Sequence, residues 1–215
     1  MNINILAGGP DELLPDLRDF NGENERWIGV DRGVITLLSK GIKPFAAFGD
    51  FDSVTESEWN QIENEVEKLS KFKPEKDETD TELALNWAVE QHPKLIRLFG
   101  ATGGRADHFL ANIQLLIHQL NQGHGCEIEM IDLKNSIMVK KPGEYYIERS
   151  AEKKYISFVP VSLEVNGLTL NGFKYPLKDR HISIGSTLCI SNELINDHGT
   201  FSFAEGILIV VRSQD

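Results

Sequence analysis

The segment LIRLFGATGGRADHFLANIQLLIHQL, residues 95–120, decides the fold of the first half of this chain. A short apolar run, Leu95–Phe99, leads into a glycine-rich turn, and the turn leads into a long helical pattern. The apolar stripe of that helix comprises Phe109, Ile113, Leu116 and Leu120. A strand, a tight turn and an amphipathic helix in this order are typical of α/β folds with a parallel sheet.

The same alternation of short apolar runs and helical patterns extends from the first residues to about residue 133. The predicted strands are Ile3–Leu6, Trp27–Val30, Phe45–Phe48, Lys71–Lys73, Leu95–Phe99 and Ile128–Asp132. The predicted helices are Asp11–Asp19, Gly33–Lys40, Val54–Ser70, Thr81–Gln91 and Asp107–Asn121. Because the strands are nearly continuous apolar runs, the sheet is expected to be covered on both sides. We therefore expect residues 1–133 to form an α/β domain with a Rossmann-like parallel sheet and helices on both faces.

The helical period disappears from about residue 134, and short runs of β-forming residues replace it. The predicted strands are Ile137–Val139, Tyr145–Glu148, Tyr155–Val159, Leu163–Val165, Leu168–Leu170, Ile182–Ile184, Thr187–Ser191, Phe201–Phe203 and Ile207–Arg212. Pro-Gly, Asn-Gly and Asp-His-Gly turn signals separate them. This pattern predicts an all-β second domain over residues 134–215, an antiparallel β-sandwich or barrel.

Composition and charge exclude several classes of protein. The formal net charge of −11 repels the backbone of nucleic acids, and no basic stripe offsets it. No apolar run approaches the roughly 20 residues that span a bilayer, and the N-terminal residues do not resemble a signal peptide. The two cysteines, Cys126 and Cys189, form no CxxC motif and lie in apolar runs, which favours free thiols in a reducing compartment. We therefore expect a cytoplasmic protein without a nucleic-acid or membrane partner.

Two aspartates follow the predicted strand at Phe45–Phe48, in the sequence Gly49–Ser53. The carboxyl ends of parallel strands are where ligands bind in open α/β sheets. Two carboxylates one residue apart, Asp50 and Asp52, are suited to Mg²⁺, which takes one or two protein carboxylates together with waters and phosphate oxygens. The alternative is that Asp52 or Ser53 caps a helix beginning at Val54.

A second acidic segment, Lys76–Asp80, leads into the predicted helix at Thr81–Gln91. Thr79 with Glu82 matches a capping box, and Asp80 suits the positive end of a helix, so a structural role accounts for the segment. Asp77 and Asp80 beside a lysine equally favour a ligand site, because like charges so close together need a cation. The sequence leaves the two interpretations open.

The glycine-rich turn at 100–108 is the third candidate. Its backbone N–H groups are expected to approach phosphate closely at the start of a helix, and Arg105 adds a guanidinium suited to phosphate oxygens. The turn matches neither Walker A nor GxGxxG, and a plain turn with Asp107 as a cap is the alternative. Weaker candidates are Ala7–Pro10, Asp31–Gly33 and Ser191–Glu193, each of which is more typical of a turn.

In this order, the motifs resemble the thiamine pyrophosphokinase family. The matching segments are Gly49–Ser53, Asp77-x-Thr79-Asp80, Gly103-Gly104-Arg105-x-Asp107-His108 and Ser191-Asn192-Glu193, which together extend over nearly the whole chain. The resemblance implies an α/β nucleotide-binding domain followed by a β-sandwich that binds thiamine and forms the dimer. It also implies a homodimer with a shared active site, which transfers the diphosphoryl group of ATP to thiamine with Mg²⁺ and releases AMP.

The resemblance also implies a role for each candidate residue. The implied catalytic residues are Asp50, Asp52, Asp77 and Asp80, of which Asp50, Asp52 and Asp80 would hold Mg²⁺. The implied ATP-binding residues are Asp31, Arg32, Ser53, Thr102, Gly103, Gly104, Arg105 and His108. The implied thiamine-binding residues are Asp77, Asp107, Ser191 and Asn192.

One departure from the family pattern concerns the ring that stacks on thiamine. Animal members have a tryptophan after the serine–asparagine pair, whereas residues 194–200 here contain none. The stacking aromatic is therefore left open. Two other functions also remain open from the residues alone: a metal-dependent phosphohydrolase, which uses the same pair of aspartates with water as acceptor, and a sensing module that binds ligand without turnover.

Overall fold

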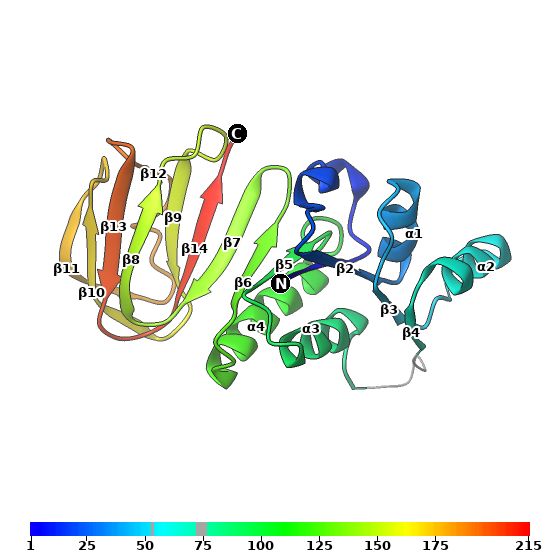
Figure 1. Ribbon diagram of the computed structural model, residues 1–215. Helices are drawn as coiled ribbons and strands as arrows, with labels where there is room; N and C mark the ends of the chain where they lie inside the picture. Colours follow the sequence, from blue (N-terminus) through cyan, green and yellow to red (C-terminus); the bar gives the residue numbers. More distant parts are fainter. Residues whose placement is uncertain (53, 72–76) are drawn as a thin grey trace. The chain divides into compact units, whose positions relative to one another are not determined.

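The computed structural model describes residues 1–52, 54–71 and 77–215, which divide into two compact units, Met1–Leu133 and Lys134–Asp215. Figure 1 shows helices among the strands of the first unit, and strands throughout the second. Within the described residues, no helix combines the length and the apolar composition that a membrane span requires.

The first unit contains a sheet whose strands are all parallel, in the order β6-β5-β1-β2-β3-β4. The strands are β1 (Asn2–Leu6), β2 (Glu25–Val30), β3 (Ala46–Gly49), β4 (Lys68–Lys71), β5 (Leu95–Phe99) and β6 (Glu127–Ile131). The prediction of a parallel sheet is confirmed. The chain leaves β1 toward β2 on one side, while β5 pairs with β1 on the other. The order of the strands therefore reverses at β1, and in open α/β sheets a ligand crevice forms at such a point.

The helices of the first unit are α1 (Arg32–Ser39), α2 (Glu56–Glu65), α3 (Asp80–Glu90) and α4 (Ala106–Gln122). The predicted helices at Gly33–Lys40, Thr81–Gln91 and Asp107–Asn121 are confirmed to within a residue at each end. Helix α4 ends at Gly123, whose φ of +75° is the left-handed conformation that stops a helix at low cost. A core cluster of this unit gathers β-strand side chains, including Trp27 and Phe99, whose ring centroids lie 5.3 Å apart.

One helix prediction is wrong, and another is confirmed only over part of its length. The segment Asp11–Asp19 forms two 3₁₀ turns, η1 (Asp11–Leu13) and η2 (Leu17–Phe20), because Pro15 in its middle lacks the N–H that a helix needs. The predicted helix Val54–Ser70 begins at Glu56 and ends at Glu65, and the chain then extends to pair β4 with β3. Sheet pairing overrides helical spacing here. The predicted strand Lys71–Lys73 overlaps β4 at Lys71, and residues 72 and 73 lie outside the described residues.

The second unit contains two antiparallel sets of strands, β12-β9-β14-β7 and β11-β10-β13-β8. Their bounds are β7 (Asn135–Lys140), β8 (Gly143–Glu148), β9 (Tyr155–Pro160), β10 (Glu164–Asn171), β11 (Leu177–Ser183), β12 (Asn192–Glu193), β13 (His198–Phe203) and β14 (Leu208–Ser213). Both sets contribute to one buried cluster, in which the Phe158 and Phe201 ring centroids lie 5.0 Å apart. The prediction of an antiparallel second half is confirmed.

Three predicted strands in this unit need correction. The runs Leu163–Val165 and Leu168–Leu170 belong to the single strand β10, since Gly167 (φ +76°) lies at an irregularity of the strand register rather than in a turn between strands. The predicted strand Thr187–Ser191 is irregular, and pairing begins only at Asn192. Ser191 has a φ of +56°, a left-handed conformation far from the dihedral angles of a regular strand.

Candidate active site

The carboxyl ends of β1, β2 and β5 surround a cavity of about 520 Å³. It lies at the point where the strand order reverses, which is where such folds bind ligands. Seven of the residues predicted from the sequence line it: Asp31, Arg32, Thr102, Gly103, Gly104, Arg105 and His108. The structure therefore brings the glycine-rich turn and the end of β2 together.

Two loops meet backbone to backbone on one wall of this cavity. The Gly9 N–H donates to the Gly100 carbonyl at 2.8 Å, which joins the turn after β1 to the turn after β5. A side chain at Gly9 would collide with that carbonyl, and one at Gly100 would collide with the carbonyl of Ala7. Gly100 also has a φ of +61°, so both positions require glycine. The sequence alone did not distinguish Ala7–Pro10 from an ordinary turn, because the partner loop lies about 90 residues away.

The glycine-rich turn is shaped by positive φ angles of 75° at Gly103 and 62° at Gly104. Arg105 occupies the N-cap position of α4 but makes no side-chain capping hydrogen bond there. Backbone N–H groups at a helix N-terminus carry a partial positive charge and bind anions. The buried Thr102 hydroxyl, on the same turn, has no hydrogen-bond partner among the described residues.

Arg105 and Asp107 form an exposed ion pair on this turn. The Arg105 Nε donates to Asp107 Oδ1 at 3.1 Å, and Nη2 lies 2.5 Å from Oδ2. The hydrogen bonds from the guanidinium hold the pKa of Asp107 at about 2, with a smaller contribution from the His108 N–H. The same contact raises the pKa of Arg105. Because exposed ion pairs are weak, Arg105 can exchange Asp107 for a phosphate oxygen at little cost.

Asn112 is a cavity residue that the sequence did not single out. It is 8% exposed on α4, and its Nδ2 donates to the Ala101 carbonyl at 3.0 Å. This hydrogen bond ties the turn to the second turn of the helix that follows it. The signal was present in the sequence, since a polar residue adjoins the apolar stripe at Ile113, but Asn in that place has no distinctive motif.

The aspartate pair lies directly after β3. Phe51, between the two aspartates, has a φ of +57° and is buried, with its ring centroid 5.4 Å from that of Trp59. The Asp52 N–H donates to Asp50 Oδ1 at 3.1 Å, which holds Asp50 across the turn. A side chain at Gly49 would collide with the carboxylate of Asp31, so the end of β3 adjoins a residue of the cavity wall.

The capping alternative for Asp52 is wrong. Helix α2 begins at Glu56, and its N-cap is Thr55, whose hydroxyl accepts the Glu58 N–H at 3.3 Å. The Glu58 carboxylate accepts the Thr55 N–H at 2.7 Å and completes the capping box. The Thr55 N–H, followed by the Thr55 hydroxyl, which donates to the same carboxylate at 2.9 Å, holds the pKa of Glu58 below its usual range. Asp52 is exposed and takes no part in the cap, while Ser53 lies outside the described residues.

The acidic segment before α3 supplies the N-cap of that helix. The Thr79 hydroxyl accepts the Glu82 N–H at 3.2 Å, so Thr79 is the N-cap, and Asp80 is the first helical residue. Thr81, one residue further, lines the cavity. The first turn of α3 is therefore part of the cavity wall. Asp77 is exposed, and Lys76 lies outside the described residues.

The remaining predicted residues lie in the second unit. The Ser191 N–H donates to Ser157 Oγ at 2.9 Å. Asn192 is 3% exposed, and its amide holds the backbone of Tyr175: Oδ1 accepts the Tyr175 N–H at 3.0 Å, and Nδ2 donates to the Tyr175 carbonyl at 2.8 Å. Asn192 thus fixes the backbone of Tyr175, a residue that is 59% exposed.

The fold and the cavity define an α/β ligand-binding protein with its site at the carboxyl edge of a parallel sheet. Two family models match: "Thiamin pyrophosphokinase, catalytic domain" over residues 17–130, and "Thiamin pyrophosphokinase, vitamin B1 binding domain" over residues 144–208. The thiamine pyrophosphokinase of Bacillus subtilis (strain 168) is 56% identical over 213 residues, which cover 99% of each chain. The chain belongs to the thiamin pyrophosphokinase family.

Solved structures agree with this assignment. The crystal structure of thiamine pyrophosphokinase from Bacillus subtilis superposes with a TM-score of 0.94 at 53% identity and covers 100% of both chains. That of a thiamin pyrophosphokinase family protein from Enterococcus faecalis has a TM-score of 0.89 at 33% identity, again covering 100% of both chains.

Proposed function

We propose that this protein is a thiamine diphosphokinase, which transfers the diphosphoryl group of ATP to the hydroxyl of thiamine and releases AMP. The observation that carries the proposal is the cavity of about 520 Å³, walled by the glycine-rich turn and the uncapped start of α4, in a chain matched by both family domains. Anion-binding N–H groups and a guanidinium suit the phosphates of ATP.

The nucleotide is assigned to the first unit, residues 1–133. Gly103, Gly104 and Arg105 are assigned to its phosphates. The other ATP-binding residues of this proposal are Asp31, Arg32, Ser53, Thr102 and His108. When phosphate draws Arg105 away from Asp107, the Asp107 carboxylate loses its cationic partner and becomes available to the positively charged thiamine. Binding of the two substrates is thereby coupled through one exposed ion pair.

The residues after β3 fit a hard divalent cation. Asp50 and Asp52 offer carboxylate oxygens on either side of the buried Phe51, and Asp80 lies at the start of α3. Among the described residues, no three His, Cys, Asp or Glu side chains are grouped to hold a metal by themselves. Mg²⁺ needs only one or two carboxylates, because waters and phosphate oxygens fill its other positions. When bound, Mg²⁺ would neutralise the charge of the phosphates.

The protein's own residues supply positioning and proton transfer. The hydroxyl of thiamine attacks the β-phosphorus while AMP leaves in line, a reaction that depends mainly on alignment. The glycine-rich turn fixes the phosphates through its bonds to Gly9 and Asn112. Asp80 or Asp77 is assigned as the base that accepts the hydroxyl proton.

Thiamine is assigned to Asp77, Asp107, Ser191 and Asn192, and the structure suggests how the last two differ. Asn192 is buried and occupied with Tyr175, so it acts by positioning, whereas Ser191 is held through its backbone and keeps its hydroxyl for a ligand. Tyr175, fixed and exposed, is our candidate for the ring that stacks on thiamine.

The two units have different roles in this proposal. Residues 1–133 are the catalytic domain, a Rossmann-like sheet with helices on both faces, supported by the strand order and by α1 and α3 lying on different sides of β2 and β3 in Figure 1. Residues 134–215 are a β-sandwich, supported by the cluster that both strand sets share, and serve thiamine binding and dimerisation. The protein is a cytoplasmic homodimer with a shared active site.

The activity is tested by following AMP with and without thiamine. Thiamine diphosphate and AMP in equal amounts, formed only with both substrates and Mg²⁺, are the expected result. Release of phosphate without thiamine would instead identify a phosphohydrolase. The shared site is tested by mixing inactive Asp52→Asn and Ser191→Ala protomers, because a mixed dimer has one intact site. No recovery after verified subunit exchange would place the whole site in one chain.

A further inference from the structure

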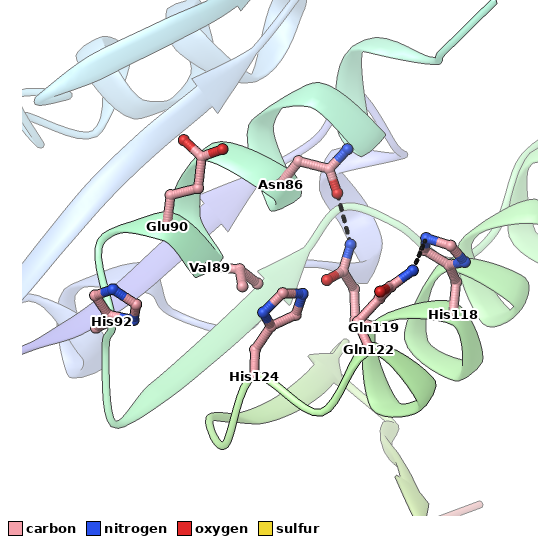
Figure 2. A pocket seen from close by; sticks show the side chains of 8 residues that line it. All are labelled: Asn86, Val89, Glu90, His92, His118, Gln119, Gln122 and His124. Atoms are coloured by element: carbon pink, nitrogen blue, oxygen red, sulfur yellow. Dashed lines mark hydrogen bonds between the residues drawn. The ribbon is translucent and has the colours of Figure 1, made fainter.

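A second cavity of the first unit, of about 510 Å³, lies between the C-terminal parts of α3 and α4, and we call it the α3–α4 pocket (Figure 2). Three of the protein's six histidines line it, and we call them the pocket histidines: His92, His118 and His124. His92 follows α3 and shortly precedes β5, and His124 follows α4 and shortly precedes β6. The pocket is therefore at the amino edge of the sheet, opposite to the candidate active site.

One residue of the lining, Gln119, carries an unsatisfied polar atom. Gln119, on α4, is 5% exposed, and its Nε2 donates to Oδ1 of Asn86, on α3, at 2.6 Å. The Gln119 Oε1 is buried and has no hydrogen-bond partner among the described residues. Buried carbonyl oxygens are nearly always hydrogen-bonded, because leaving one unpaired is unfavourable. A ligand that reaches this oxygen would have to offer it an N–H or O–H donor.

The charge around the pocket favours a cation. Both helices end here, and neither has a basic residue in its last turn to balance the partial negative charge of the terminal carbonyls. Glu90, at the end of α3, adds an exposed carboxylate to the lining. An anion would meet all these groups unfavourably.

The shape of the lining favours a planar molecule. The pocket histidines contribute three flat imidazole rings to the lining, and in Figure 2 the ring of His124 lies in the middle, with His92 on one side and His118 on the other. The His118 Nε2 lies 3.3 Å from the Gln122 Nε2, which ties that ring to α4. We propose that the α3–α4 pocket binds a small planar organic cation with N–H donors, of the amidinium or protonated aminoheterocycle class, with one N–H on the Gln119 Oε1.

The test uses benzamidinium as probe, and benzoate as a control of the same shape and opposite charge. Histidine imidazole signals of the full-length protein are followed by ¹H–¹³C NMR during each titration. We expect benzamidinium to shift the signals of the pocket histidines saturably. The other three, His108, His181 and His198, should not move. Unmoved pocket signals, equal shifts of all six, or equal shifts with benzoate would overturn the proposal.

Two variants test the chemistry of the pocket. Gln119→Met keeps the length of the side chain but removes the acceptor, so benzamidinium should bind about tenfold more weakly. Glu90→Gln removes the exposed charge, so we expect about threefold weaker binding, whereas Glu63→Gln, an exposed change on α2, should have no effect. Since Glu90 is exposed, this variant tests the proposal even if Gln119→Met does not fold. If Glu90→Gln and a folded Gln119→Met both bind benzamidinium as tightly as the wild type, the proposed site is refuted. The partner of the Gln119 Oε1 would then be water.

Discussion

The substitution Asp52→Asn separates metal binding from helix capping, because the structure assigns the cap to its neighbour Thr55. Asp52 is exposed, and its hydrogen bond to Asp50 is made by the backbone N–H, which Asn retains. We therefore expect its free energy of unfolding to change by less than about 0.5 kcal/mol. If the carboxylate is a ligand of Mg²⁺, kcat/KM should fall at least about a hundredfold, which corresponds to about 2.7 kcal/mol of transition-state stabilisation.

Thr55→Ala is the matched control, three residues away. It removes a hydroxyl that accepts the Glu58 N–H in the capping box of α2. Loss of such a cap costs about 1 kcal/mol, which lowers Tm by about 2–4 °C in a protein of this size. Because Thr55 is assigned no role with substrate, kcat at a temperature where the variant is folded should stay within about twofold of the wild type.

Two measurements decide the outcome: thermal unfolding by circular dichroism without ligand, and AMP formation at saturating Mg²⁺. We expect Asp52→Asn to lose activity but keep its stability, and Thr55→Ala to lose stability but keep its activity. If Asp52→Asn keeps its turnover within about twofold, Asp52 is no metal ligand. If instead its Tm falls as far as that of Thr55→Ala, its contribution is structural.

Three further predictions concern the cavity and the second unit. Asn112→Ala breaks the hydrogen bond to the Ala101 carbonyl, so stability should fall by about 1–3 kcal/mol and KM for ATP should rise, as steady-state kinetics and chemical denaturation can check. Tyr175→Ala should raise KM for thiamine about tenfold with little change in kcat, while Tyr175→Phe, which keeps a stacking ring, should behave as the wild type. The pKa of Asp107, about 2 in the folded protein, lies below its unfolded value, so its contribution to stability is present above about pH 4 and is lost as pH falls toward 2. Arg105→Ala should raise this pKa, and a carboxyl NMR titration that found it unmoved would exclude Arg105 as its cause.

Local patterns predict much of the fold. The apolar stripe predicts helix α4, and Gly123 predicts where it stops. Both signals are local, because they depend only on residues within a few turns of the helix. The end of the helix predicted at 54–70 is wrong for the opposite reason. The last residues of that segment have helical spacing, but they form a strand because β3 offers them backbone hydrogen bonds. The periodicity of one segment carries no information about the strand with which that segment pairs. Pro15, by contrast, was a local signal against the helix at 11–19.

The candidate site likewise contains some residues that local motifs identify and others that only the structure reveals. Asp31, Arg105 and the glycines stand in short motifs at strand ends, so the sequence identifies them and the fold brings them to one cavity. Gly9 and Asn112 each bind a carbonyl of the glycine-rich turn, and their own segments mark them only weakly. Most of the residues predicted to bind ligands stand in recognisable motifs, whereas Gly9 and Asn112 are identified only through their hydrogen-bond partners.

The role proposed for Asn192 changes once its contacts in the structure are known. The motif alone assigns the asparagine to thiamine, yet its amide uses both its donor and its acceptor on the backbone of Tyr175 and is almost fully buried. A buried amide already satisfied on both sides gains little by turning to a ligand, because it would leave the Tyr175 N–H and carbonyl unpaired. In the proposed function, Asn192 therefore acts by holding the backbone of Tyr175 in place. Replacement of Asn192 should then affect thiamine binding through Tyr175, and a double-mutant cycle between Asn192→Ala and Tyr175→Ala should show effects on KM that are not additive.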